Sequence, residues 1–264
     1  MRGLKLLRNS KKKSVDMHPK AVDGTRILVA GSSGGIGSAV VDALSKTPNS
    51  VIGAHGATQP YAGSAKNIIK IQKNLQSAED CEELVAQFSN STERLDSLVV
   101  LVGGIAGAEC VPDITEEAWA HDIQLNLTVP FFLAQAAFRQ MLKQDSGGRI
   151  ILTGTESSLH GGGPNSLAYG VAKYGIECVV KGLAKAGADN GVLVNGVRLG
   201  FIASGFHERW QAKTPDDMVS RAKMVPLKRA GTPQEVAALI NYLLSDWSQF
   251  ITGQMISISG GDWL

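Results

Sequence analysis

The chain has few cysteines, and their positions exclude the two structural uses that cysteine most often has. Cys81, Cys110 and Cys178 are the only three among 264 residues, and no two of them stand at the short spacing of a metal site or a redox pair. Scattered thiols in a chain of this length indicate a reduced compartment. We therefore expect a cytoplasmic protein without bound metal.

The sequence also has no long hydrophobic run. No stretch of about 18 consecutive apolar residues occurs, and no apolar segment typical of a signal peptide follows Met1. We expect no interaction with a membrane. With 44% hydrophobic residues, a chain of this length can still bury a full core.

Positive charge is concentrated at the amino-terminal end. Seven Lys and Arg residues against Asp16 give the first 20 residues a net charge of +6, so the total of +2 leaves −4 for the rest. A mildly acidic body indicates that it does not bind nucleic acid. We expect residues 1–23 to be a flexible basic extension and residues 24–264 to be one domain. A nucleic-acid or membrane-surface arm is the alternative role for the extension.

From Thr25 onward, short apolar stretches alternate with amphipathic ones. The pattern predicts strands at 26–30, 51–52, 68–71, 97–102, 149–153, 192–197 and 255–258. It predicts helices that begin near 36, at 77–88, through 131–141, around 169 and at 233–244. Alternating β and α units of this length predict a Rossmann-like, doubly wound parallel sheet in a single α/β domain.

Glycines cluster directly after the first predicted strand. Gly31 permits a tight turn, Gly35 allows the backbone to approach a pyrophosphate, and Gly37 allows close packing of helix on sheet. The amino terminus of the following helix offers free N–H groups and a partial positive charge to an anion. In this strand–turn–helix context the cluster predicts a dinucleotide site.

Tyr169 and Lys173 are four residues apart on a predicted helix and therefore share one face. An ammonium beside a phenol favours the phenolate, so we expect Lys173 to lower the pKa of Tyr169 towards values useful for proton transfer. The spacing alone is weak evidence, because many helices carry a surface Tyr and Lys four apart.

With the glycine turn and the Tyr-Lys pair in one chain, the sequence resembles the short-chain dehydrogenase/reductase family, in its single-domain branch. The resemblance spans about residues 24 to 264. Asn126 stands where the family has an asparagine at a helix kink, and Gly200 to Ser204 match the stretch that holds the nicotinamide carboxamide. Several spaced motifs in one order are more specific than any one of them.

The resemblance implies an NAD(P)-dependent oxidoreductase that interconverts a ketone and a secondary alcohol by hydride transfer. Tyr169 would be the general acid/base, Lys173 would hold the ribose hydroxyls, Thr155 would position the carbonyl oxygen, and Asn126 would join a water relay. The implied cofactor contacts are Gly31, Ser33, Gly35, Ile36, Gly37, His55, Asn74, Leu75, Val102, Gly103, Tyr169, Lys173, Gly200, Ile202 and Ser204.

The chain departs from the family pattern at three places. Thr155 stands where the family usually has serine, and it is fourteen positions before Tyr169, one more than usual, so Ser157 or Ser158 are alternatives for this role. Val100 to Gly103 replace an Asn-Asn-Ala-Gly stretch. Leu199 replaces the proline usual before Gly200.

The choice between NAD and NADP depends on the end of the second strand. An acidic side chain there would bind the ribose 2′-hydroxyl of NAD, and a basic one would favour the 2′-phosphate of NADP. The chain has His55 at that place and Gly34 where many NADP enzymes have arginine. Because no acid repels the phosphate, we expect a slight preference for NADP(H).

The substrate is expected to be a small carbonyl compound or alcohol, with a 3-oxoacyl thioester as the alternative. The segment 160–163, and the segment 206–210 with the residues that follow it, occupy the family's substrate loop and lid. Arg198 would either meet an anionic group or pair with Glu156. A non-catalytic, dinucleotide-binding sensor or scaffold of the same fold is the alternative of another class. The family implies a homo-oligomer, a tetramer or a dimer, with the 131–141 helix and the 255–258 strand at its interfaces.

Overall fold

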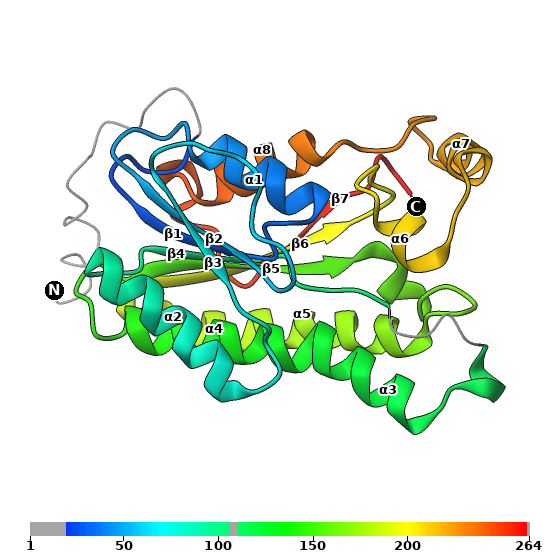
Figure 1. Ribbon diagram of the computed structural model, residues 1–264, viewed down its shortest axis with the longest axis horizontal. Helices are drawn as coiled ribbons and strands as arrows, with labels where there is room; N and C mark the ends of the chain where they lie inside the picture. Colours follow the sequence, from blue (N-terminus) through cyan, green and yellow to red (C-terminus); the bar gives the residue numbers. More distant parts are fainter. Residues whose placement is uncertain (1–19, 106–109, 263–264) are drawn as a thin grey trace, which may run out of the picture.

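A single parallel sheet forms the centre of the molecule. The computed structural model describes residues 20–105 and 110–262, and within them the strands run in the order β3-β2-β1-β4-β5-β6-β7 (Figure 1). The strands are β1 (Arg26–Ala30), β2 (Val51–Gly56), β3 (Ile68–Gln72), β4 (Ser97–Val100), β5 (Gly148–Thr155), β6 (Val192–Leu199) and β7 (Met255–Ile258). The order reverses between β1 and β4, which is the doubly wound topology that the sequence predicts.

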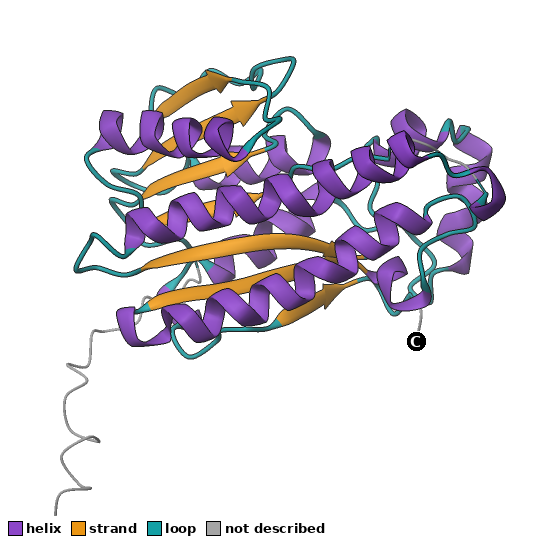
Figure 2. Ribbon diagram, turned by 90° about the horizontal axis from the view of Figure 1, so that it is seen from below, coloured by secondary structure: helices purple, strands orange, loops and turns teal. Residues whose placement is uncertain are grey.

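Helices cover both faces of this sheet. In Figure 1, α1 and α8 lie above it, and α2, α4 and α5 lie below it; Figure 2 shows the lower layer from outside. The helices are α1 (Gly35–Leu44), α2 (Ala78–Thr92), α3 (Glu116–Ile123), α4 (Val129–Met141), α5 (Leu167–Gly187), α6 (Phe206–Gln211), α7 (Pro215–Met224) and α8 (Pro233–Leu243). Among the described residues, no helix is long and apolar enough to span a membrane.

Apolar side chains on both faces of the central strands explain this layering. Leu28 and Leu98 pack with α2, α4 and α5, whereas Ile27 and Val99 pack with α1 and α8. All four side chains are fully buried. Strands that are apolar on both faces need cover on both faces, so their composition requires the helical layers.

Local capping sets the ends of several helices. Thr232 and Glu235 form a capping box at the start of α8, and Ser77 and Asp80 form one at α2. Each box satisfies two otherwise free backbone N–H groups. The α2 helix continues to Thr92, one turn beyond the predicted end at residue 88.

The structure differs from the sequence prediction in the carboxyl-terminal third. Helices α6 and α7 occupy a stretch in which only a substrate loop was expected. Neither helix contains a fully buried residue. Without a buried apolar stripe, short helices of this kind leave little periodic signal in the sequence.

The folded body begins before residue 24. Ala21 is buried against the layer of α1 and α8, and its backbone N–H donates to the Asn241 side chain at 2.8 Å. Ala21, which the sequence assigns to the extension, therefore packs on the folded body, while the division at residue 24 stays a prediction. Most of the predicted basic extension lies outside the described residues.

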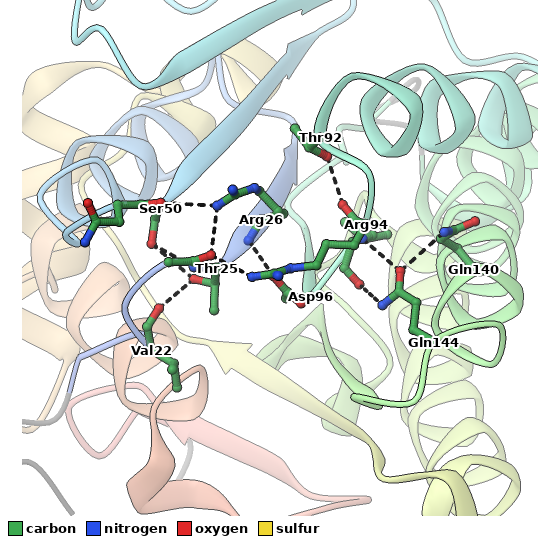
Figure 3. Close-up of polar contacts among 12 residues, drawn as sticks. Val22, Thr25, Arg26, Ser50, Thr92, Arg94, Asp96, Gln140 and Gln144 are labelled. Atoms are coloured by element: carbon green, nitrogen blue, oxygen red, sulfur yellow. Dashed lines mark hydrogen bonds and ion pairs between the residues drawn. The ribbon is translucent and has the colours of Figure 1, made fainter.

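Polar contacts join the segments at the amino-terminal ends of the strands (Figure 3). The Asp96 carboxylate accepts from the Arg26 backbone N–H at 2.7 Å and from the Arg94 side chain at 2.9 Å. The Gln144 side chain accepts from Leu95 N–H and donates to Leu95 C=O. These contacts lie at the amino-terminal ends of the strands. A doubly wound sheet binds its ligands at the opposite, carboxyl-terminal ends, at the switch point between β1 and β4.

Candidate active site

A cleft of about 910 Å³, counted out to its open mouth, lies at the carboxyl ends of the central strands. Its lining comes from the loops after β1, β4 and β6, from the ends of β5 and β6, and from helices α1, α5 and α6. Eleven of the fifteen predicted cofactor contacts line it: Gly31, Gly35, Ile36, Gly37, Val102, Gly103, Tyr169, Lys173, Gly200, Ile202 and Ser204.

The glycine turn leaves no room for side chains. Gly31 has a φ of +91°, and a Cβ there would lie 2.8 Å from the carbonyl carbon of Leu101. A Cβ on Gly35 would overlap the carbonyl oxygen of Ser204, and one on Gly37 would overlap the Gly31 backbone. Backbone from the β1 and β6 loops is thus in direct contact, so these positions require glycine, and the approach of Gly35 to a pyrophosphate stays a prediction.

The amino terminus of α1 opens into the cleft without a cap of its own. Its N-cap residue, Gly34, has no side chain to accept from the first turn, and that turn contains no acidic residue. By contrast, α2, α7 and α8 each begin with a capping box. The N–H groups and the partial positive charge at the start of α1 are therefore available to an anionic group.

Tyr169 and Lys173 lie on one face of α5 and both line the cleft. The Lys173 Nζ is 5.9 Å from the centre of the Tyr169 ring. It donates to the carbonyl oxygens of Thr153, at 3.2 Å, and Val102, at 3.5 Å. Since an ammonium has three N–H groups, these two bonds leave one for a ligand.

The pKa of Tyr169 contradicts the prediction for this pair. Burial raises the pKa of the Tyr169 phenol, and the nearby Thr155 hydroxyl opposes this only in part. Burial lowers the pKa of Lys173 to about 8. The expectation that Lys173 lowers the tyrosine pKa is wrong for the ligand-free chain, because desolvation of the phenolate outweighs an ammonium at this distance.

Asn126 lies behind the cleft in a π-helical turn, Gln124–Thr128, between α3 and α4. Its side chain accepts from Gly104 N–H at 3.1 Å and donates to the carbonyl oxygens of Gly104, at 2.9 Å, and Asp122, at 3.0 Å. Pro130 has no N–H for the Asn126 carbonyl, so the α-helical ladder cannot continue unchanged here. The helix irregularity implied by the resemblance is present, and Asn126 fastens it to the loop after β4.

Thr155, at the end of β5, lines the cleft together with Thr153, whose hydroxyl donates to the Val100 carbonyl oxygen at 2.7 Å. Neither Ser157 nor Ser158 lines the cleft, and Ser158 is buried, with its hydroxyl donating to the Thr155 carbonyl oxygen at 2.6 Å. The position therefore favours Thr155 over the two serine alternatives.

Four predicted cofactor contacts do not line the cleft: Ser33, His55, Asn74 and Leu75. His55 is buried, its ring Nε2 lies 2.8 Å from the Lys73 carbonyl oxygen, and burial lowers its pKa. Its carbonyl oxygen instead accepts from the N–H groups of Gly31 and Ser32, which supports the glycine turn. Leu75 packs in the core beneath the sheet, while Ser33 and Asn74 are exposed.

The cleft also contains residues that the sequence did not assign to the cofactor or to catalysis. Helix α6 contributes Phe206, His207, Arg209 and Trp210 to its wall. The Phe206 ring centre is 5.9 Å from that of Tyr169. This helix falls within the segment expected to form the substrate loop and lid, but its individual contacts depend on tertiary packing.

Arg198 belongs to the scaffold of the site. Its guanidinium lies 3.4 Å from the Glu156 carboxylate and 3.2 Å from the Glu177 carboxylate, and all three side chains are largely buried. Of the two alternatives from the sequence, the structure favours the pairing with Glu156. No group of three or more metal-binding side chains is found in the described part of the chain.

Comparison with known proteins identifies the family. A family model described as Enoyl-(Acyl carrier protein) reductase matches residues 30–262. A 3-oxoacyl-[acyl-carrier-protein] reductase from Synechocystis sp. is 32% identical over 243 residues, which are 89% of this chain and 95% of the relative. The chain belongs to the short-chain dehydrogenase/reductase family.

One further relative and one solved structure complete the comparison. Glucose 1-dehydrogenase 2 from Bacillus subtilis is 28% identical, with 92% of this chain and 96% of the relative covered. A short-chain type dehydrogenase/reductase from Mycobacterium ulcerans has the same fold, with a TM-score of 0.82 at 22% identity over 91% of this chain and 90% of that one. As a family member, the protein is an NAD(P)-dependent oxidoreductase of carbonyl or alcohol groups, which confirms the predicted reaction class.

The residues of the cleft fit a nicotinamide dinucleotide. The uncapped start of α1 suits a pyrophosphate, and the crowded glycines leave the approach to it free of side chains. The remaining Lys173 N–H suits a ribose hydroxyl. The short-chain dehydrogenase/reductase motifs thus meet in one place although they are far apart in the sequence.

Proposed function

We propose that the protein is a reductase or dehydrogenase in which Tyr169 transfers the proton and Thr155 positions the reacting oxygen. The observation that carries this proposal is the meeting of Tyr169, Lys173 and Thr155 on the wall of one cleft that begins at the glycine turn. When bound, the dinucleotide supplies or accepts the hydride.

Each side chain has a distinct task in this proposal. The Tyr169 hydroxyl gives its proton to the substrate oxygen during reduction and takes it back during oxidation. The Thr155 hydroxyl donates to the same oxygen and so limits its movement. Lys173 holds the ribose hydroxyls. Asn126 keeps the loop after β4 in place and joins the path by which the proton is replaced.

The raised pKa of Tyr169 agrees with its use as an acid. A phenol that keeps its proton at neutral pH is ready to protonate a carbonyl oxygen during reduction.

Turnover of a carbonyl panel by wild type and Tyr169→Phe tests this proposal. Phenylalanine keeps the ring and removes the hydroxyl, so we expect turnover to fall roughly a hundredfold or more while dinucleotide affinity is kept. Equal turnover by both proteins would contradict the role of Tyr169. Dinucleotide binding without any turnover in the wild type would favour a sensor or scaffold.

We propose that NADP(H) is accepted in slight preference to NAD(H). The support is the lack of an acidic residue at the end of β2, where Gly56 to Gln59 are all uncharged. The nearby Lys73 is already paired with Asp80 and Glu83, so it contributes little attraction to a phosphate. Dissociation constants for NADPH and NADH measured side by side test this preference, which a tighter NADH complex would contradict.

A 3-oxoacyl thioester is the substrate class with most support among the alternatives. The relative from Synechocystis sp. is named as a reductase of this class. The cleft wall includes Leu101, Val102, Leu199 and Phe206, which suit an acyl chain. Parallel assays with a 3-oxoacyl thioester and with glucose separate this class from the sugar class of the Bacillus subtilis relative.

We also propose that the protein is a homo-oligomer. Val171 and Tyr174 expose 42% and 55% of their surfaces on α5, and β7 is an edge strand of the sheet. An exposed aromatic and an aliphatic residue on one helix suit burial against a second copy. The mass measured by light scattering after size-exclusion chromatography tests this, and a monomer would contradict it.

A further inference from the structure

Besides the nearby Tyr169 hydroxyl, the hydroxyl group of Thr155 has two partners at the end of β5. Its Oγ1 donates to the Leu199 carbonyl oxygen at 3.3 Å and lies 3.2 Å from the Ser157 Oγ. Thr155 and Leu199 are paired residues on neighbouring strands β5 and β6. Ser157 is in the 3₁₀ turn, Glu156–His160, that follows β5.

The number of protons decides the direction of these bonds. A threonine hydroxyl has one proton and two lone pairs. A carbonyl oxygen can only accept, so the proton of Thr155 is used on Leu199. Ser157 must therefore be the donor in its contact with Thr155, which gives a chain of donors from Ser157 through Thr155 to Leu199.

This chain is held loosely at the point where a substrate would enter. Hydroxyl donors usually lie about 2.7–2.8 Å from their acceptors, and both bonds of Thr155 are longer than that. A substrate oxygen in the cleft would compete with the Leu199 carbonyl for the single proton of Thr155. A donor behind Thr155 polarises its O–H group and makes it a better donor to the new acceptor.

We propose that Ser157 is a positioning residue for the reaction: it donates to Thr155 and thereby directs the Thr155 hydroxyl to the substrate oxygen. Ser157 does not line the cleft, so it acts through Thr155. The inference rests on the proposed function, because Thr155 must donate to a substrate for this to matter.

Ser158 provides a matched control in the same turn. Its hydroxyl donates to the backbone carbonyl oxygen of Thr155 and not to the side chain. Ser158→Ala therefore removes the same chemical group one residue away without interrupting the donor chain.

A double-mutant cycle with Ser157→Ala and Thr155→Val tests the inference. Steady-state kinetics use the best carbonyl substrate from the panel, and quenching of tryptophan fluorescence gives its dissociation constant in the presence of dinucleotide, since Trp210 lines the cleft. We expect Ser157→Ala alone to lower kcat/KM roughly three- to tenfold, the size of one hydrogen bond. We expect most of this loss in kcat.

The second arm of the cycle separates positioning from folding. In the Thr155→Val background, Ser157→Ala should have no further effect on kcat/KM or on the dissociation constant, because there is no hydroxyl left to direct. Ser158→Ala should change these quantities by the same factor in both backgrounds. Ser157→Thr, which keeps a hydroxyl, should retain most of the wild-type kcat.

The outcomes distinguish this inference from the proposed function. Two results would overturn the role of Ser157 alone, provided that Tyr169→Phe and Thr155→Val are impaired. One is wild-type kinetics in Ser157→Ala, and the other is an equal loss of kcat/KM from Ser157→Ala in the wild-type and Thr155→Val backgrounds. If Tyr169→Phe and Thr155→Val also keep full turnover, the proposed function fails and the inference fails with it.

Discussion

Lys173 makes the stability of the folded chain depend on alkaline pH, and the size of this effect follows from its burial. The side chain is 3% exposed, and burial lowers its pKa from 10.5 to about 8. At roughly 1.4 kcal/mol per pKa unit, this difference corresponds to about 3 kcal/mol. The cost of burying the ammonium is present below about pH 8 and disappears as the pH approaches 10.5.

The sign follows from proton binding. Between these two pKa values, the unfolded chain holds the Lys173 proton and the folded chain has lost it. Because the unfolded state binds more protons, the free energy of unfolding contributed by this group rises with pH. Burial raises the pKa of the neighbouring Tyr169, so the phenol keeps its proton over this range.

The assay compares wild type with Lys173→Met in urea unfolding, without dinucleotide, from about pH 7 to about 10.5. Methionine keeps the apolar length, and loss of the bonds to Val102 and Thr153 adds an offset that does not vary with pH. We expect the free energy of unfolding of wild type to gain about 3 kcal/mol relative to the variant over this range. Lys181→Met, which removes an exposed lysine of α5, is the control. A difference between wild type and Lys173→Met that stays constant with pH would refute the reasoning.

Three further substitutions test the parts of the fold that shape the site. Gly31→Ala combines a φ of +91° with a Cβ 2.8 Å from the Leu101 backbone. We therefore expect the free energy of unfolding to fall by at least about 2 kcal/mol and dinucleotide binding to weaken. An unchanged urea midpoint would contradict this. Asn126→Leu keeps the volume but removes three buried hydrogen bonds, so we expect the free energy of unfolding to fall by roughly 2–4 kcal/mol. Calorimetry measures this as a lower Tm, and an unchanged Tm would contradict the prediction. Thr232→Ala removes the cap of α8 and should cost about 1 kcal/mol while dinucleotide affinity, measured by titration, is unchanged.

The strand and helix pattern could be predicted because it depends on short-range composition. The apolar β1 and β4 segments indicate strands covered on both faces, and each was found within about two residues of its predicted bounds. Helices α6 and α7 could not be predicted because neither has a buried stripe. The position of α6 depends on contacts with distant residues, such as the Trp210 ring beside Gly104.

The site was predictable where a residue's task depends on its own chemistry. Glycines at 31, 35 and 37 are needed because the backbone is crowded, and Tyr169 and Lys173 share a face because of helical spacing. The His55 side chain does not line the cleft, because its direction at the end of β2 depends on packing with the Lys73 backbone beyond β3, and its predicted contact with the cofactor stays a prediction. Similarly, the pKa of Tyr169 depends on burial by segments far away in the sequence.

The sequence alone determined the architecture, the family resemblance and most of the predicted residues that meet in the cleft, because periodicity, turn glycines and motif spacing are local properties of the chain. Only the tertiary structure decided which hydroxyl faces the cleft, that Arg198 belongs to the scaffold, and that Ser157 stands behind Thr155. These depend on hydrogen bonds and desolvation between segments that are separate in the sequence. Local sequence patterns do not determine the distances between these side chains, because those distances depend on how the distant segments pack in the folded core.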